Sequence, residues 1–237
     1  MLRGLLVLLL VPSAASAGTL VGKLELPAAP ERPAAATKGF LDRVENPLAP
    51  LQPTNVPHQM VIVVEGDEKP ATPPQVTWDL LGDSFARPVV AAPAGAEVVI
   101  KNSSKTAHTL VAKEDPKLVP PGPINPTGPK SFRATDPGKV YTITDPDAPY
   151  LLGKLVVVNT QFIAYPDDSG KFQIDDIPAG TYKVKVWYRD GWLDRPDDSV
   201  TVNAKGKTEL NPKITALASS PGPGAGPGPS TSGPAKK

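Results

Sequence analysis

Few side chains of this 237-residue sequence could bind a soft metal ion or act as a nucleophile. Cysteine is absent, which excludes disulfides, thiolate metal sites, iron–sulfur clusters, cysteine nucleophiles and lipid anchors on cysteine. The chain has two histidines, His58 and His108. If the fold brings His108 to Asp145 and Asp147, an imidazole and two carboxylates could hold a hard cation. The alternative is that His108 packs or hydrogen-bonds at one end of a β-sandwich.

No motif of a catalytic site accompanies these residues. The sequence lacks Gly-x-Ser-x-Gly, a Walker phosphate loop and His-Glu-x-x-His, and neither histidine has a nucleophile motif nearby. Asp167, Asp168, Asp175 and Asp176 do not have the spacing of a calcium loop, and a role in turns explains them better. We therefore expect a protein that is not an enzyme and carries no cofactor.

Two tryptophans, Trp187 and Trp192, are candidate binding residues. Strand alternation over residues 182–188 places Trp187 on the polar face, beside lysines, and Trp192 follows a turn. An exposed tryptophan can stack on a sugar ring or anchor a protein partner. The alternative is that Trp187 covers a junction with a second sandwich. For Trp78 we expect packing.

Charge and composition limit the classes of partner. The 25 basic and 24 acidic residues leave no excess of positive charge to attract nucleic acid or anionic lipid. Proline and glycine are abundant, with 31 and 20 residues, while 40% of the chain is hydrophobic. This composition predicts a folded core in part of the chain and many turns and linkers in the rest.

The first residues are typical of a secretory signal peptide. A positive start, the apolar run of residues 4–11 and the small residues before position 18 predict cleavage after Ala17. No later stretch has the roughly 18 apolar residues of a membrane span. We expect the mature protein to be soluble and either periplasmic or extracellular.

The elements that must position these residues are short strands. Turn residues recur about every 8–12 positions and no helical period is evident, which predicts an all-β fold of two β-sandwiches. The β-branched run at residues 60–64 is typical of a strand buried on both faces. Residues 27–57 are a proline-rich connector, residues 65–77 a loop, and residues 216–237 a disordered tail rich in proline and glycine. We expect strands at residues 20–26, 60–64, 89–92, 97–101, 109–112, 131–134, 139–144, 155–158, 162–165, 171–174, 181–188, 200–202 and 209–214.

The C-terminal part carries a specific motif. Within residues 167–184, DDSGKFQI followed by DIPAGTYKV resembles the pattern of carboxypeptidase regulatory-like domains, which are small transthyretin-like sandwiches. The first strands of such a domain match the start of the mature chain and residues 59–66. The resemblance implies that residues 18–66 and 159–215 form one sandwich, into which residues 76–158 are inserted.

The inserted stretch resembles a cupredoxin of the plastocyanin type. Residues 89–102 are similar to the run that leads to the first copper ligand, and His108 falls at the place of that ligand. Residues 132–141 are similar to the approach to the second ligand. The resemblance implies a cupredoxin-like Greek-key domain over residues 76–158.

The same resemblance implies that the copper site is lost. The Cys-x-x-His-x-x-Met ligands of the family correspond here to Thr142, Asp145 and Ala148, which leaves His108 alone. Threonine supplies no thiolate and alanine cannot coordinate, so we expect no metal at this site.

These observations predict a secreted or periplasmic binding or interaction protein without catalysis. Its expected partner is an envelope protein or polysaccharide, and it would have no nucleic-acid partner and no membrane span. One alternative is a carbohydrate-binding module that uses Trp187 and Trp192. A second is a copper-binding electron-transfer protein.

Overall fold

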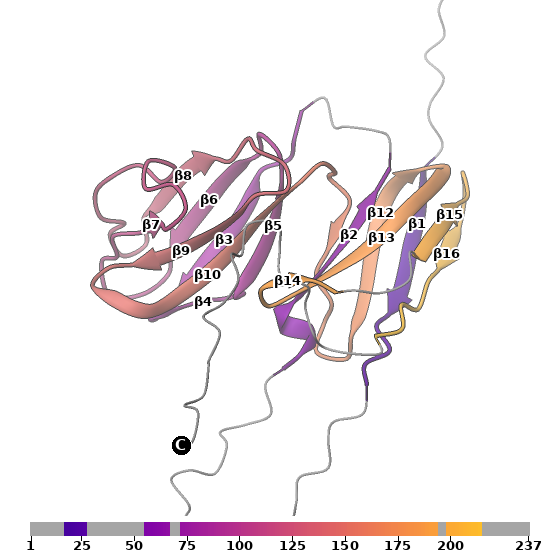
Figure 1. Ribbon diagram of the computed structural model, residues 1–237, viewed down its shortest axis with the longest axis horizontal. Coiled ribbons are helices and arrows are strands. Elements are labelled where there is room, and N and C mark those ends of the chain that lie inside the picture. Colours follow the sequence, from indigo (N-terminus) through magenta and orange to yellow (C-terminus); the bar gives the residue numbers. More distant parts are fainter. Residues whose placement is uncertain (1–16, 28–54, 67–71, 194–197, 215–237) are drawn as a thin grey trace, which may run out of the picture.

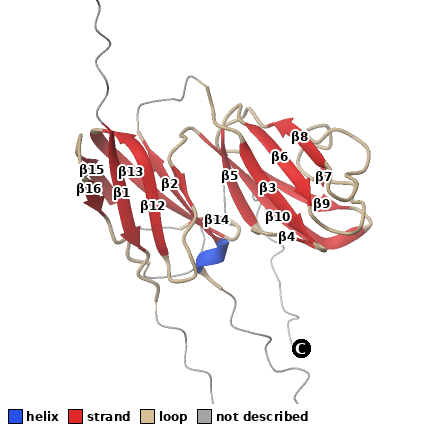
Figure 2. Cartoon of the chain, turned by 180° about the vertical axis from the view of Figure 1, so that it is seen from behind, coloured by secondary structure: helices blue, strands red, loops and turns tan. Residues whose placement is uncertain are grey.

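A computed structural model describes residues 17–27, 55–66, 72–193 and 198–214 of the chain. Apart from one short 3-10 turn at Pro57–Gln59, the described residues form strands, turns and loops, so the all-β prediction is confirmed (Figures 1 and 2). The expected signal peptide, most of the proline-rich connector and the tail at 216–237 lie outside the described residues.

One sandwich combines strands from both ends of the chain and is called the N/C sandwich here. Its first sheet has the order β12-β1-β16, and in its second sheet β2 and β13 are central. The residues near 20 and 60 therefore pair with the C-terminal strands. The strands are β1 (Ala17–Lys23), β2 (Met60–Glu65), β11 (Ile163–Ala164), β12 (Lys171–Pro178), β13 (Gly180–Tyr188), β14 (Gly191–Trp192), β15 (Asp198–Val202) and β16 (Lys207–Glu209).

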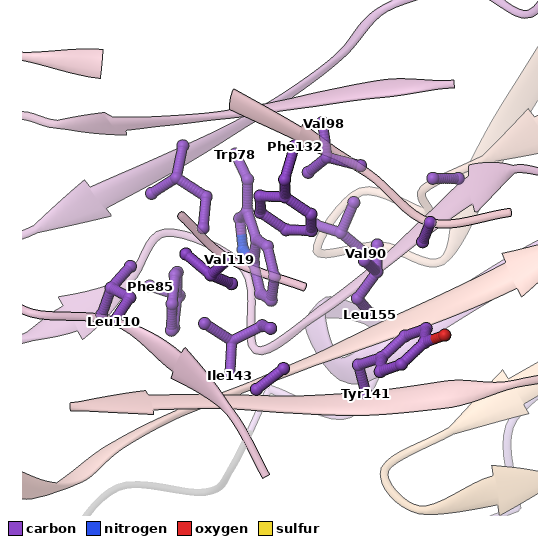
Figure 3. Close-up of a cluster of buried hydrophobic side chains, with 14 of the residues drawn as sticks. Trp78, Phe85, Val90, Val98, Leu110, Val119, Phe132, Tyr141, Ile143 and Leu155 are labelled. Carbon is purple, nitrogen blue, oxygen red and sulfur yellow. The ribbon is translucent and has the colours of Figure 1, made fainter. Parts of the chain in front are cut away.

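The strands between β2 and β11 form the central sandwich. Its two sheets have the orders β4-β3-β6-β8 and β5-β10-β9-β7. The strands are β3 (Val76–Leu81), β4 (Ser84–Phe85), β5 (Val89–Pro93), β6 (Glu97–Asn102), β7 (Val111–Ala112), β8 (Pro129–Arg133), β9 (Val140–Asp145) and β10 (Ala148–Val158). Figure 3 shows its core, where the Trp78 and Phe85 rings stack with centroids 4.2 Å apart.

The two sandwiches pack against each other through β2 and β5. Alternate residues of β2 belong to different cores: Ile62 faces the N/C core, while Val61 and Val63 pack with Val89 and Val156 at the junction. All five residues from Met60 to Val64 are buried, as the β-branched run predicts. The four sheets are therefore stacked face to face, and the two inner sheets are covered on both faces.

Several details differ from the expected strands, among them β14, which the sequence also did not indicate. The structure contains β3 and β4, which the sequence did not indicate, because β3 gains its pairing from β6, a distant parallel neighbour. Strand β10 begins at Ala148 rather than near Leu155, with a register irregularity that accommodates Pro149. The strand expected at 109–112 is shorter, and in place of the one expected at 209–214 the structure has β16 at Lys207–Glu209. In the described part of the chain, no helix is long and apolar enough to cross a membrane.

Candidate functional site

The structure brings His108 and Asp145 together at one end of the central sandwich. Asp145 is the last residue of β9, and the backbone of His108 forms a two-bond antiparallel bridge with Ile124. His108 Nδ1 lies 3.0 Å from Asp145 Oδ2, and the two residues are 4% and 3% exposed. A carboxylate at this distance accepts the Nδ1 proton and so orients the imidazole ring.

The carboxylate of Asp145 has further donors. The backbone N–H of Thr109 donates to Oδ2 at 3.2 Å, and the backbone N–H of Asp147 donates to Oδ1 at 3.0 Å. Asp147 therefore meets Asp145 through its backbone, while the residue itself is exposed. Among the described residues, no group of three or more His, Cys, Asp and Glu could hold a metal ion. The hard-cation arrangement of His108, Asp145 and Asp147 does not form.

The second ring nitrogen of His108 also has a partner, which the sequence did not reveal. Nε2 lies 3.0 Å from Thr106 Oγ1, within hydrogen-bond distance. Asn102 Nδ2 donates to the carbonyl oxygens of Thr106 and Ile124, both at 2.8 Å. The order carboxylate, imidazole, hydroxyl is that of nucleophile triads. Here the three groups connect the loop that carries Thr106 and His108 to the end of strand β9.

Thr142, matched to the cysteine ligand by resemblance, does not lie beside His108. Residues 142 and 145 are three apart in β9, so their side chains point to opposite faces of the sheet. The Thr142 hydroxyl donates to Glu114 Oε1 at 2.8 Å, and its N–H donates to Oε2 at 2.6 Å. Lys154 Nζ donates to the same hydroxyl at 3.0 Å. Thr142 is thus fully engaged on the face of the sheet that points away from the central core.

Glu114, Thr142 and Lys154 form a second hydrogen-bonded cluster, in which the Glu114 carboxylate is the acceptor for Thr142. Partial burial raises the pKa of the Glu114 carboxyl, but the hydrogen bonds from Thr142 and the nearby Lys154 outweigh burial and leave the pKa below its usual value. Ala148, matched to the methionine ligand, is buried in the core of the central sandwich. Of the three positions matched to copper ligands, only Asp145 reaches His108.

Trp187 lies on the face of β13 opposite the N/C core, as alternation predicts, but this face is buried at the junction between the sandwiches, so the expected exposure is wrong and the junction alternative holds. Its side chain is 1% exposed, packs with Val61 and Val156, and donates from Nε1 to the carbonyl oxygen of Arg189 at 2.9 Å. Alternation groups residues by face, but it does not show that the face of Trp187 is covered by a second sandwich. Trp192 is half-buried and meets Trp187 edge-on, with an interplanar angle of 87°. The two rings do not form an exposed coplanar platform for a sugar.

Comparisons with known proteins find partial similarities. The family model for domain II of polysaccharide lyase family 4 matches residues 142–210, from β9 to just beyond β16. No curated protein sequence matches the chain. Amicyanin from Paracoccus versutus is similar at 17% identity, over 40% of this chain and 96% of amicyanin, with a TM-score of 0.31. A purple cupredoxin from Nitrosopumilus maritimus is similar at 14% identity, over 35% of this chain and 99% of its own, with a TM-score of 0.31. Each of these similarities covers less than half of the chain.

Proposed function

We propose that this chain is an exported, non-catalytic binding protein whose central, cupredoxin-like sandwich carries a hydrogen-bonded histidine in place of a copper site. The observation that carries this proposal is the pairing of both ring nitrogens of His108, Nδ1 with Asp145 and Nε2 with Thr106. A histidine ligates a metal through a free nitrogen lone pair. Here Nδ1 faces a carboxylate and Nε2 faces a hydroxyl, so a metal ion could bind His108 only by displacing one of these partners.

The residues around His108 do not fit type 1 copper. That centre needs two imidazoles and a thiolate, with a weak axial ligand. Asp145 offers a hard carboxylate that already accepts N–H donors from Thr109 and Asp147. Thr142 is turned toward Glu114, and Ala148 has only a methyl group. We therefore derive no electron transfer through this position.

Copper titration tests the proposal. Cupric ion is added to the purified chain while visible absorption and the melting temperature are recorded. We expect no visible absorption band and an unchanged melting temperature, with the same absorption spectrum for His108→Ala. A visible band that the wild-type chain shows and His108→Ala lacks would contradict the proposal and favour the electron-transfer alternative.

Export and domain division are parts of the same proposal. Residues 1–17 would be removed as a signal peptide, so mass spectrometry of exported protein should find a chain that begins at Gly18. We assign residues 18–66 and 159–215 to one domain and residues 76–158 to the inserted one. The carboxypeptidase regulatory-like assignment of the first domain rests on the motif within residues 167–184. The expected partner is an envelope protein or polysaccharide, and a pull-down from envelope extract would identify it.

Carbohydrate binding is a second candidate, favoured by the match to a polysaccharide lyase domain. A shallow groove of about 680 Å³ crosses β1, β12 and β16 of the N/C sandwich, and polar side chains including Lys23, Gln173 and Asn211 line it. Such side chains can hydrogen-bond sugar hydroxyls. Affinity electrophoresis on acidic and neutral polysaccharides should then show retardation that Gln173→Ala weakens. Unchanged mobility on every polysaccharide tried would remove this candidate.

A further inference from the structure

A cavity of about 410 Å³ lies between the two sandwiches, at a place that none of the sequence motifs marked. Cavities of roughly 300–1,000 Å³ at domain interfaces are typical of small-molecule sites. The lining comes from both sandwiches. It includes Val76, Asp79, Arg87, Val90, Ile163 and Tyr165.

Arg87 is the distinctive residue of this cavity. Its Nη1 atom is buried and has no hydrogen-bond partner among the described residues. A buried guanidinium nitrogen without an acceptor is costly, and a native structure rarely leaves one unpaired without a reason. Nη1 itself is covered by protein atoms, but Arg87 as a whole is half-buried and lines the cavity, so a ligand there would meet the rest of the side chain and its charge.

The wall around Arg87 is held in place before any ligand arrives. Trp78 Nε1 donates to the carbonyl oxygen of Arg87 at 2.8 Å, which fixes the backbone. The guanidinium carbon lies 5.0 Å from the centroid of the Tyr165 ring. Tyr165 itself is fixed by Ala91: its hydroxyl accepts from the N–H at 3.1 Å and donates to the carbonyl oxygen at 3.2 Å. A preformed wall of this kind lowers the entropy that binding would cost.

The charges on the wall select one class of ligand. The planar fork of a guanidinium matches the two oxygens of a carboxylate. Asp79 lines the same cavity and adds a negative charge, which opposes a dianion such as phosphate. Val76, Val90 and Ile163 supply apolar surface for the rest of the molecule.

We propose that this junction cavity binds a small organic monocarboxylate, with the carboxylate on Arg87 and the apolar part against Val90 and Ile163. The inference rests on the proposed binding function and names its ligand class. The site takes no part in the His108 network, because neither His108 nor Asp145 lines the cavity.

Titration with phenylacetate, followed by NMR, tests this proposal. The indole N–H of Trp78 reports on the site because it is bonded to the Arg87 backbone. We expect phenylacetate to shift this signal saturably and its neutral analogue phenylacetamide to bind about ten-fold more weakly, as the loss of a charge-assisted pair implies. Arg87→Gln should weaken phenylacetate to the same degree. Arg133→Gln is the matched control, because Arg133 is an exposed arginine that donates to Gly95 and does not line the cavity.

Several outcomes would overturn the proposal: no saturable shift with phenylacetate, equal affinity for phenylacetamide, equal affinity for inorganic phosphate, or unchanged binding by Arg87→Gln. If Arg87→Gln does not fold, Thr77→Trp decides, because Thr77 is exposed on the cavity lining and a large ring there closes the cavity while Arg87 stays. Loss of phenylacetate binding then supports the proposal, and retained binding overturns it. Copper titration is independent of these results, so failure of the ligand class and failure of the proposed function are distinguishable.

Discussion

At the scale of single residues, His108 is defined by what its two nitrogens contact. The 37 residues that separate His108 from Asp145 in sequence conceal a contact of 3.0 Å. Because Asp145 accepts from an imidazole and two backbone N–H groups, it joins the segment of His108 and Thr109 and the turn at Asp147 to the end of β9. A buried carboxylate in such a network is hard to replace by a neutral group of the same shape.

Asp145→Asn is expected to destabilise the protein. The amide that replaces the carboxylate has one acceptor oxygen for three donors, so a buried donor loses its partner, at a cost of about 1–3 kcal/mol. Urea unfolding measures the change. Asp136→Asn is the control, since its ion pair with Lys139 is exposed and screened by solvent and should contribute far less to stability. Equal stability of Asp145→Asn and the wild type would show that the network contributes nothing.

At the scale of elements, strand β10 owes its position to a glycine under the largest aromatic pair of the central core. A Cβ atom at Gly153 would overlap the Trp78 ring and lie 2.7 Å from Phe85. Strand β10 therefore approaches β3 and β4 closely only because residue 153 has no side chain.

Gly153→Ala should lower the free energy of unfolding by about 1–3 kcal/mol, the usual cost of an overpacked core. Chemical denaturation measures this, and near-UV circular dichroism should report a disturbed Trp78 environment. Leu152→Ala is the neighbouring control, because Leu152 is 47% exposed. If the two variants unfold at the same denaturant concentration, the close packing of β10 on Trp78 does not require a glycine at position 153, and the prediction is contradicted.

Local sequence patterns predicted the elements that depend on neighbours in the chain. The run at 60–64 predicted a strand buried on both faces, because its apolar residues continue without alternating with polar ones. Strand β3 was not predicted, because it pairs in parallel with β6, which is not its neighbour in the sequence. The separation of Thr142 from His108 was foreseeable, since positions 142 and 145 have opposite parity in a strand. The Asp145 contact and the junction cavity were not, because both depend on segments that meet only in the folded chain.

At the scale of the whole molecule, the junction makes the two sandwiches one packed body. Trp187 and the valines of β2 and β5 supply its apolar centre, and Tyr165 adds a polar tie to Ala91. Burial raises the pKa of the Tyr165 hydroxyl to about 12, although its bonds with Ala91 and the nearby Arg87 act in the opposite direction.

This pKa predicts an alkaline loss of stability. The folded protein holds the Tyr165 proton up to a pKa of about 12, whereas the unfolded chain releases it near the usual tyrosine pKa of 10.0. The stabilisation is therefore complete below pH 10 and declines as pH rises toward 12. Tyr165→Phe should be less stable near neutral pH, because it lacks the bonds to Ala91, and its deficit should shrink across that pH window. Melting temperatures recorded against pH test this. A deficit that stays constant would show that Tyr165 does not titrate with unfolding.

The most direct test of the central claim is an NMR measurement of the two His108 ring nitrogens before and after Cu(I) is added without oxygen. With Nδ1 on Asp145 and Nε2 on Thr106, we predict a proton on Nδ1 and an unprotonated Nε2, with both signals unchanged by one equivalent of copper. A proton on Nε2 in the free protein, or a copper-dependent shift of either nitrogen, would contradict a histidine held by Asp145 in place of a metal.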